Sequence, residues 1–531
     1  MKTYQKKYRR CLAGALICVL VGTIFGVVLQ FFKGDVLDYA IARDVEKTIL
    51  SAALLIGFIL CETIGFFLYE RFSARFVTGC TRELKHDIFE SIVRRNYVSY
   101  KQCPQGEYIA KYTNAADMIK EQRFRMLPVL WEILFKVILV STALFFLDVR
   151  IAIVTIVLLT TPLYVPKLIE KKLQSAQNAY IEAVEENLAK VNDWLSGFEI
   201  IKNYSIERKI MARFKAANDR TMEKMLKDAQ LGAVSGLITT LISYLSYFIV
   251  LACATGLVLN GDFSAGDFFV AIGMIDQLSY PLISLAGIIR RLIAIKPACQ
   301  EMEEFLRISE AEQQSRGIEE LKNEILFKNV AFSYDGEREV LSDFNLTIRK
   351  GARYLLKGPS GCGKTTAINL LLKYYEACRG QIEIDGVPLA QIDSTYALMT
   401  VVRQEATLFH DTLRNNLTMY CNAANERLFE VLRSVGLERY ANAQALDEVV
   451  TESGANFSGG EKKRICLARA LLRDTDVLIL DEPLANLDEE NASRIEDLLL
   501  SIPDKTLLVV SHQFTEEKLR CFDRVIDFAS R

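Results

Sequence analysis

Histidine is scarce in this chain of 531 residues, which has three of them. They lie far apart in the sequence, so they do not indicate a histidine-rich metal site. The chain has twelve cysteines, but no two of them form a Cys-x-x-Cys pair. This spacing argues against a disulfide framework and favours reduced thiols in contact with the cytosol. The formal net charge is −2. Because a nucleic-acid partner would require a basic surface, we expect no nucleic acid to bind.

Apolar residues are abundant and make up 51% of the chain. Six stretches are apolar and long enough to cross a hydrocarbon layer of about 30 Å. We predict membrane spans at about residues 11–32, 48–69, 127–147, 149–168, 231–259 and 268–289. The first follows five Lys/Arg in residues 2–10 and contains no charge. Its length and its flanking residues favour a retained span over a cleaved signal peptide.

The distribution of Lys and Arg predicts the orientation of these spans. Segment 71–126 holds eleven Lys/Arg against six Asp/Glu, whereas segment 33–47 holds three against four. Since positively charged loops stay in the cytoplasm, the N-terminus and segments 71–126 and 169–230 are expected there. Both long segments have helical patterns, with breaks near residues 103–106 and Gly197. We therefore predict an all-α membrane domain over residues 1–298, with six transmembrane helices and long cytoplasmic extensions.

Glu62, Glu132, Lys136 and Asp276 are ionisable residues within the predicted spans. Glu132 and Lys136 are four residues apart and are expected to pair on one helix face. Glu62 and Asp276 have no local partner in the sequence. Because charges are costly in lipid and usually face an interior or water, these two acids are candidates for lining a pathway.

The charged segment 299–324 is predicted to be a linker, and residues 325–531 alternate strands and helices as in an α/β domain. A run in this domain fits the pattern G-x-x-x-x-G-K-[ST] of a phosphate-binding loop, after an apolar strand and before a helix. The loop comprises Gly358, Pro359, Ser360, Gly361, Cys362, Gly363, Lys364, Thr365 and Thr366. Its backbone amides and Lys364 would hold the phosphates of ATP, and Thr365 would bind Mg²⁺.

Two further strands complete the predicted ATPase site. The run Val477-Leu478-Ile479-Leu480-Asp481-Glu482 reads as a buried parallel strand that ends in two acids. Asp481 would hold Mg²⁺, and Glu482 would orient and deprotonate the attacking water. A third strand at 506–510 would place His512 beside these strand ends.

The sequence Phe457-Ser458-Gly459-Gly460-Glu461 resembles the L-S-G-G-Q signature of ATP-binding cassette (ABC) transporters. The resemblance implies that Ser458, Gly459 and Gly460 bind the ATP that is held by a partner cassette. It implies that Tyr334 stacks on adenine, that Gln404 senses Mg²⁺ and water, and that His512 lies near the γ-phosphate. Glu452 resembles the acid that contacts the cytoplasmic turns, and Leu487-Asp488 resembles the end of the D-loop.

Six spans followed by one cassette resemble an exporter-type half-transporter. The resemblance implies a homodimer or a heterodimer with a similar chain, in a bacterial cytoplasmic membrane, with the cassette in the cytoplasm. It also implies coupling elements around residues 106–117 and 197–207. We expect ATP-driven export of a small molecule, lipid or peptide. An importer of exporter shape, as for siderophores, and a membrane ATPase that regulates a partner are the alternatives.

Two departures from the family pattern concern the signature and the D-loop. Glu461 replaces the usual glutamine and is expected to bring a negative charge close to the partner's nucleotide, where the helix N-terminus would tolerate it. The run Leu484-Ala485-Asn486 replaces the usual Thr-Ser-Ala.

Overall fold

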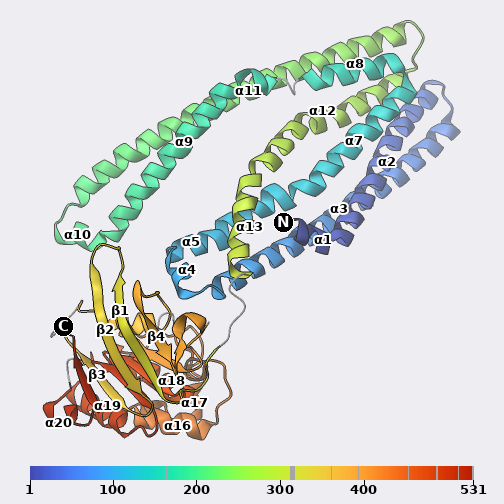
Figure 1. Cartoon of the computed structure of the whole chain (residues 1–531). Helices are drawn as coiled ribbons and strands as arrows, with labels where there is room; N and C mark the ends of the chain where they lie inside the picture. The colour runs from blue at the N-terminus through green and yellow to red at the C-terminus, as the bar shows by residue number, and fades with distance from the viewer. Residues whose placement is uncertain are drawn as a thin grey trace. The chain divides into compact units, whose positions relative to one another are not determined.

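The computed structural model describes the chain except residues 162–164, 311–316, 360, 393, 452–453, 486–487, 512–513 and 529–531. The chain forms two compact units (Figure 1). The first comprises Met1–Glu90 and Gln105–Leu306, and the second comprises Ser91–Pro104 and Arg307–Arg531.

The first unit is built from helices. They are α1 (Lys2–Lys7), α2 (Arg9–Ile41), α3 (Val45–Val93), α5 (Gln105–Ala110), α6 (Ala116–Ile119), α7 (Met126–Leu147), α8 (Val149–Thr160), α9 (Val165–Ser196), α10 (Phe198–Asn203), α11 (Glu207–Leu259), α12 (Ala265–Ala294) and α13 (Lys296–Glu310). Two π-helical turns, Lys111–Ala115 and Lys120–Phe124, connect α5, α6 and α7 into one long helical stretch. Among the described residues, four stretches are long and apolar enough to cross a membrane: Arg9–Ile41, Val45–Val93, Gln105–Leu147 and Glu207–Leu259.

Short polar turns separate the apolar helices, as the sequence predicts. Asp148 lies between α7 and α8, and its Oδ1 accepts hydrogen bonds from the backbone N–H of Arg150 and Ile151 at 2.7 and 3.2 Å. Ser264 begins α12 through a capping box with Asp267. Both caps satisfy backbone donors that a helix start leaves unpaired. Only Asp148 separates α7 from α8, and residues 260–264 separate α11 from α12.

Small residues allow α2 to approach its neighbours closely. A Cβ added to Gly65 of α3 would lie 2.9 Å from the Cα of Gly22, and one added to Gly34 would lie 2.8 Å from the carbonyl oxygen of Gly266 in α12. Such contacts favour helix association where water provides no hydrophobic driving force.

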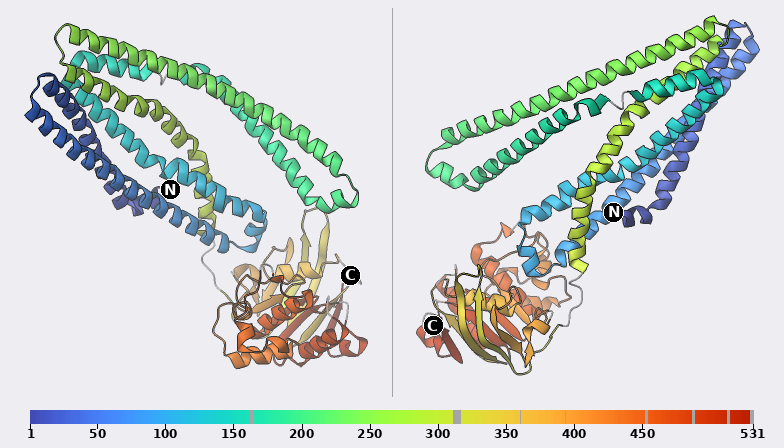
Figure 2. Two further views of the ribbon diagram at one scale, coloured as in Figure 1. Left: turned by 180° about the vertical axis from the view of Figure 1, so that it is seen from behind. Right: turned by 45° about the horizontal axis from the view of Figure 1, so that its top comes forward.

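The first break in the long helices includes residues 102–104, close to the predicted break at residues 103–106. Helix α3 continues to Val93, a short helix α4 (Tyr97–Lys101) follows, and α5 begins at Gln105. Residues 106–117, the expected coupling element, are helical, and their coupling role stays a prediction. Asn96 determines where the turn begins, since its side chain caps α4 by accepting from Ser99 N–H at 2.8 Å. The second break is confirmed, because Gly197 lies between α9 and α10, and α9 and α11 run side by side (Figure 2).

The second unit contains two sheets. The antiparallel sheet has the order β2 (Glu339–Arg349), β1 (Glu324–Ser333), β4 (Arg379–Ile384) and β5 (Val387–Pro388). The parallel sheet has the order β6 (Met399–Val402), β7 (Val477–Asp481), β8 (Thr506–Val510), β3 (Arg353–Lys357) and β9 (Arg524–Asp527). All five residues of β7 and of β8 are buried, as expected for central parallel strands.

Helices surround these sheets. They are α14 (Lys364–Leu371), α15 (Leu413–Thr418), α16 (Asn425–Ser434), α17 (Ala443–Leu446), α18 (Gly459–Arg473), α19 (Glu489–Ser501) and α20 (Glu516–Leu519). The predicted fold class, an all-α membrane domain followed by an α/β P-loop ATPase domain, is confirmed by this arrangement. Because the strands β3, β7 and β8 are parallel neighbours, their carboxyl ends meet at one edge of the sheet, where ligands bind in open α/β folds.

Candidate nucleotide-binding site

The phosphate-binding loop connects β3 to α14, as predicted. Gly358, Gly361 and Gly363 have φ values of 145°, 82° and 100°, in a region that favours glycine. Gly363 also lacks space for a side chain, because an added Cβ would lie 2.7 Å from Leu341 Cδ2. The glycine backbone leads directly into the N-terminus of α14, whose unpaired N–H groups and dipole suit an anion.

Lys364 is the first residue of α14 and is 7% exposed. Its Nζ donates to the carbonyl oxygens of Gly358 and Pro359 at 2.6 and 2.7 Å and lies 3.5 Å from Cys362 Sγ. The ammonium group is thus held over the loop by its own backbone. A phosphate bound to the loop would meet this fixed positive charge.

Tyr334 is joined to the same helix. Its hydroxyl and Oγ1 of Thr366 are 3.1 Å apart, and its ring meets Phe332 and Tyr375 edge to face. The Tyr334 side chain is 55% exposed, so one face of the ring is available beside the loop. Thr365, the expected Mg²⁺ ligand, is exposed in the first turn of α14.

Asp481 ends β7 and is 7% exposed. Burial raises the pKa of its carboxyl group, whereas the nearby guanidinium of Arg403 lowers it. Arg403 Nη1 lies 3.8 Å from Asp481 Oδ2, and Arg403 Nη2 donates to Asn369 Oδ1 of α14 at 2.8 Å. Arg403 was not predicted as a site residue, although it directly precedes Gln404. Gln404 follows β6 and is exposed.

Glu482 has a φ of 51°, an uncommon value for a residue other than glycine, and this conformation turns the chain away from β7. Its N–H donates to Val510 O of β8 at 2.8 Å, which fixes Glu482 at the sheet edge. Its carbonyl oxygen accepts from Nζ of Lys463, which also donates to Ala485 O at 3.3 Å. Lys463 belongs to α18 and is buried, and burial lowers its pKa. The sequence did not identify this link between the signature helix and the catalytic strand.

The signature motif forms the start of α18. Ser458 is the N-cap, and Gly459 and Gly460 form the first turn. Glu461 Oε2 accepts from the backbone N–H and the hydroxyl of Ser458, both at 2.9 Å. In the described part of the chain, no hydrogen bond joins Ser458, Gly459 or Gly460 to the phosphate-binding loop.

Glu461 is neutralised within its own chain. Its side chain is 12% exposed and forms an ion pair with Arg439, and Tyr440 donates to Glu461 Oε1 at 3.3 Å. Burial would raise the pKa of Glu461, but the bonds to Ser458 and the charge of Arg439 lower it overall. Arg439 therefore compensates the charge of Glu461 within the same chain, and the position of Glu461 close to the partner's nucleotide stays a prediction.

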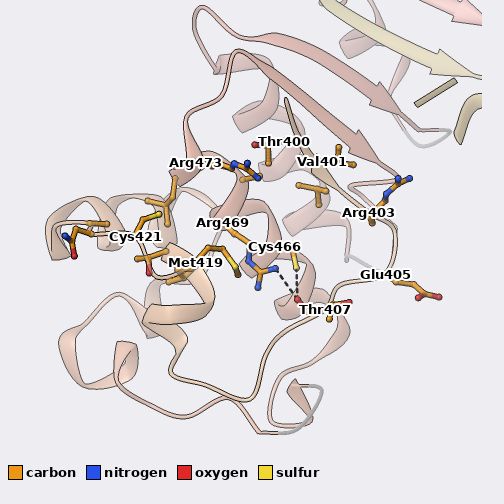
Figure 3. Close-up of a pocket in the computed structure, with 17 residues that line it drawn as sticks. Thr400, Val401, Arg403, Glu405, Thr407, Met419, Cys421, Cys466, Arg469 and Arg473 are labelled. Atoms are coloured by element: carbon orange, nitrogen blue, oxygen red, sulfur yellow. Dashed lines mark hydrogen bonds between the residues drawn. The ribbon is translucent and has the colours of Figure 1, made fainter. Parts of the chain in front are cut away.

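A cavity of about 730 Å³ lies beside β6, between α15 and α18 (Figure 3). Arg403, Thr407, Met419 and Cys466 are among the residues that line it. Thr407 O accepts from Arg469 Nη1 at 3.2 Å, so the cavity wall is tied to α18. The cavity thus begins at the segment that follows β6 and contains Gln404.

The short helix α4 contacts this region through stacked rings. Tyr97 stacks on Tyr374 with ring centroids 3.7 Å apart and an angle of 14°. The guanidinium of Arg403 lies 5.3 Å from the centroid of the Tyr374 ring. A continuous set of contacts therefore leads from α4 through Tyr374 and Arg403 to Asp481.

Some predicted site residues lie outside the described part of the chain. They are Ser360, Glu452, Asn486, Leu487 and His512. Asp488 is described: it caps α19, and its Oδ1 accepts from Asn491 N–H at 2.9 Å.

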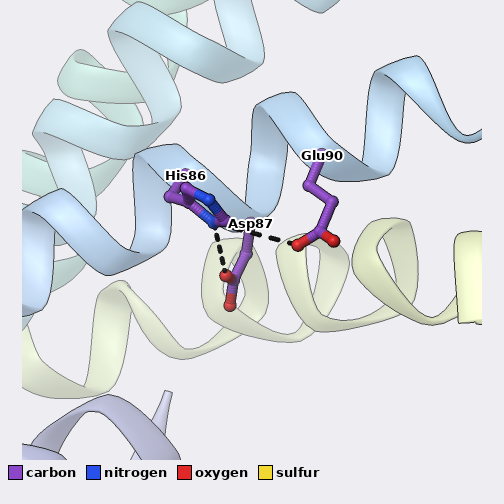
Figure 4. Close-up of side chains that lie close together, drawn as sticks. All are labelled: His86, Asp87 and Glu90. Carbon is purple, nitrogen blue, oxygen red and sulfur yellow. Dashed lines mark hydrogen bonds and ion pairs between the residues drawn. The ribbon is translucent and has the colours of Figure 1, made fainter.

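His86, Asp87 and Glu90 lie close together on α3 (Figure 4), with potential ligand atoms within 4.8 Å of one another. The sequence did not indicate this cluster. Asp87 accepts from the hydroxyl of Tyr4 at 2.7 Å. His86 Nδ1 lies 3.5 Å from Asp87 Oδ1 and 3.8 Å from Glu90 Oε2. Ion pairs on the surface of a helix have the same geometry, so the cluster does not by itself indicate a metal site.

A phosphate-binding loop after β3, two acids at the end of β7 and a capped signature helix define a P-loop ATPase of the cassette type. Comparison with known families gives the same class. The family described as "ABC transporter transmembrane region" matches residues 12–282, and the family described as "ABC transporter" matches residues 341–485. The chain belongs to the ABC transporter family. It is an integral membrane protein that binds nucleotide and couples ATP hydrolysis to transport.

The similarity to known proteins extends over most of this chain and most of each relative. The "Uncharacterized ABC transporter ATP-binding protein YwjA" of Bacillus subtilis (strain 168) is 26% identical, over 84% of this chain and 78% of its own. The "ATP-dependent lipid A-core flippase" of Haemophilus ducreyi is 25% identical, over 96% of this chain and 90% of its own. The fold resembles a solved bacterial Atm1-family ABC exporter with ATP bound, with a TM-score of 0.77 and 22% identity, over 98% of this chain and 93% of that one. The chain is an exporter-type half-transporter, and the import alternative is not favoured.

Proposed function

We propose that this chain is one half of a dimeric exporter in a bacterial cytoplasmic membrane, with six spans and with its N-terminus and cassette in the cytoplasm. Two copies, or this chain and a similar one, would form two composite ATP sites. The exported substrate would be a small molecule, a lipid or a peptide. The similarity to a lipid flippase supports the lipid among these three.

The observation that carries the dimer proposal is the position of the signature. Ser458 caps α18 and bonds to Glu461, and no described hydrogen bond joins it to the loop of its own chain. The loop, in turn, offers amides and Lys364 to a phosphate. Each chain thus supplies both halves of a site, which a second cassette would bring together.

Within each site we assign the following roles. Tyr334 stacks on adenine, and residues 358–366 with Lys364 hold the phosphates. Thr365, Gln404 and Asp481 hold Mg²⁺. Burial raises the pKa of the Asp481 carboxyl group, so a nearby positive charge is needed to stabilise its ionised form. Arg403 supplies one such charge, and a bound Mg²⁺ would suit the same carboxylate. Bound Mg²⁺ would neutralise charge on the β- and γ-phosphates.

Glu482 and His512 complete the site in this proposal. Glu482 would accept a proton from the attacking water, because it follows Asp481 at the sheet edge and its backbone is fixed by Val510 and Lys463. His512 would lie near the γ-phosphate at the end of β8. Closure of the two cassettes on ATP would favour one state of the membrane domain, and hydrolysis would favour the other.

The proposed function is tested with purified protein in lipid nanodiscs and in vesicles. We expect the protein to hydrolyse ATP in the presence of Mg²⁺, and we expect transported compounds to stimulate this hydrolysis. We also expect ATP-dependent uptake of such a compound into inside-out vesicles. The matched control is Glu482→Gln, which should bind ATP and transport nothing. ATP-dependent movement only in the opposite direction, or ATPase activity that depends on another protein with no compound transported, would contradict the proposal.

A further inference from the structure

Lys463 is a buried cation on the signature helix. It lies in the second turn of α18 and is 4% exposed. Burial lowers the pKa of its ammonium group, and the charges of Glu482 and Asp481 offset this effect only in part. Lys463 forms no ion pair among the described residues. Since a buried charge is costly unless its donors are satisfied, the hydrogen bonds of this ammonium group are expected to matter.

The ammonium group connects the two ends of the turn that follows β7. Its Nζ donates to the carbonyl oxygen of Glu482 and, at 3.3 Å, to that of Ala485. The N–H of Ala485 also donates to Glu482 O at 3.3 Å, which closes a turn over residues 482–485 with Pro483 in its second position. Lys463 therefore holds the first and the last residue of this turn from the side of α18.

The backbone of Glu482 depends on such support. Its φ of 51° lies in the left-handed region, which is unfavourable for a residue with a side chain and persists where surrounding contacts fix it. On the side of the sheet, Glu482 N–H donates to Val510 O of β8 at 2.8 Å. The N–H of Glu482 is thus fixed by the sheet and its carbonyl group by Lys463. The direction of the Glu482 side chain depends on both bonds.

We propose that Lys463 is a positioning residue for ATP hydrolysis, which keeps the Glu482 carboxylate directed at the attacking water by holding the turn after β7. The proposal rests on the proposed role of Glu482 as general base. Lys463 itself touches neither nucleotide nor water in this account. Ser458 caps the same helix and would contact the ATP of the partner cassette. Helix α18 would thus act on one composite site through Ser458 and on the other through Lys463.

Substitutions of Lys463 in the full-length dimer in nanodiscs test this role. Lys463→Met keeps the length of the side chain but removes the donor, so we expect kcat to fall by about tenfold or more through misplacement of Glu482. The KM for MgATP should change by less than about twofold, because the phosphate-binding loop is unchanged. Lys463→Gln and Lys463→Arg keep N–H donors, and at least one of them should recover most of the lost kcat. ATP affinity and the thermal unfolding midpoint report whether each variant is folded.

A mixed dimer then shows on which composite site Lys463 acts. One chain carries Lys364→Ala and the other Ser458→Arg, so the intact site uses Glu482 of the Ser458→Arg chain. Lys463→Met added to that chain should remove most of the activity. The same substitution on the Lys364→Ala chain, whose own site is already inactive, should cost much less.

Three outcomes would overturn the proposal. They are a kcat of Lys463→Met close to that of wild type, no recovery in either Lys463→Gln or Lys463→Arg, and equal losses from the two placements in the mixed dimer. Failure of the proposed function looks different. In that case Glu482→Gln would hydrolyse ATP, or the mixed dimer would be inactive before Lys463 is changed.

Discussion

Arg403 Nη1 lies 3.8 Å from Oδ2 of Asp481, and this contact joins the segment around Gln404 to the acid at the end of β7. The same guanidinium lies over Tyr374, on which Tyr97 of α4 stacks. A displacement of α4 would therefore reach Asp481 through side chains already in contact. The charge of Arg403 also stabilises the ionised form of the buried Asp481 carboxyl group.

Replacing Arg403 by methionine should change the pH dependence of hydrolysis. Arg403 lowers the pKa of Asp481, so its removal raises that pKa and reduces the fraction of ionised Asp481 at acidic pH. We expect the acidic limb of kcat/KM for MgATP to move to higher pH. Arg403→Lys, which keeps the charge, is the control. Identical pH profiles for Arg403→Met and wild type would show that this contact does not affect Asp481 in the working enzyme.

Replacing Arg439 by glutamine should impair hydrolysis severalfold. The partly buried Glu461 would lose its counterion, and its charge would then act on the partner's nucleotide. ATP binding by the loop should not change. The double variant Arg439→Gln/Glu461→Gln removes both charges and should recover most of the activity. A double variant no more active than Arg439→Gln would mean that Arg439 acts by another route.

Replacing Glu482 by glutamine should abolish turnover and preserve ATP binding, because the amide keeps the size of the side chain but cannot accept the proton. ATP should then accumulate in closed dimers, detectable by nucleotide retention and by cross-linking between subunits. Hydrolysis by this variant at close to the wild-type rate would exclude Glu482 as the general base.

Modification of Cys362 by N-ethylmaleimide should inhibit the ATPase. Cys362 Sγ lies 3.5 Å from Lys364 Nζ, so the adduct would occupy the space of the phosphates. Bound MgATP should protect, and Cys362→Ser should be active and resistant. Since the chain has eleven other cysteines, the variant is decisive. Inhibition of Cys362→Ser as strong as that of wild type would assign the effect to another thiol.

Local patterns predicted the parts of the site that depend on neighbours in the sequence. The glycines of the loop, the buried strand ending at Asp481 and the helix start at the signature each lie within a few residues of the signal that identifies them. The apolar runs likewise predicted the helices on either side of Asp148. These features depend on backbone geometry and on short-range periodicity.

Contacts between distant residues could not be predicted in this way. The pair Arg439–Glu461 joins a turn before α17 to α18, and Lys463 connects α18 to Glu482. The short helix α4 was not predicted, because its start depends on the Asn96 cap, whereas the break after Lys101 is marked in the sequence by Pro104 and Gly106. Only the folded arrangement shows which charges meet.

The composite site is tested most directly with dimers purified through two different affinity tags, one on a Lys364→Ala chain and one on a Ser458→Arg chain. Both lesions can fall in one composite site and leave the other intact. We predict that both mutant homodimers are inactive and that the mixed dimer retains clear ATPase activity. Full activity of the Ser458→Arg homodimer, or a mixed dimer as inactive as both homodimers, would contradict the account.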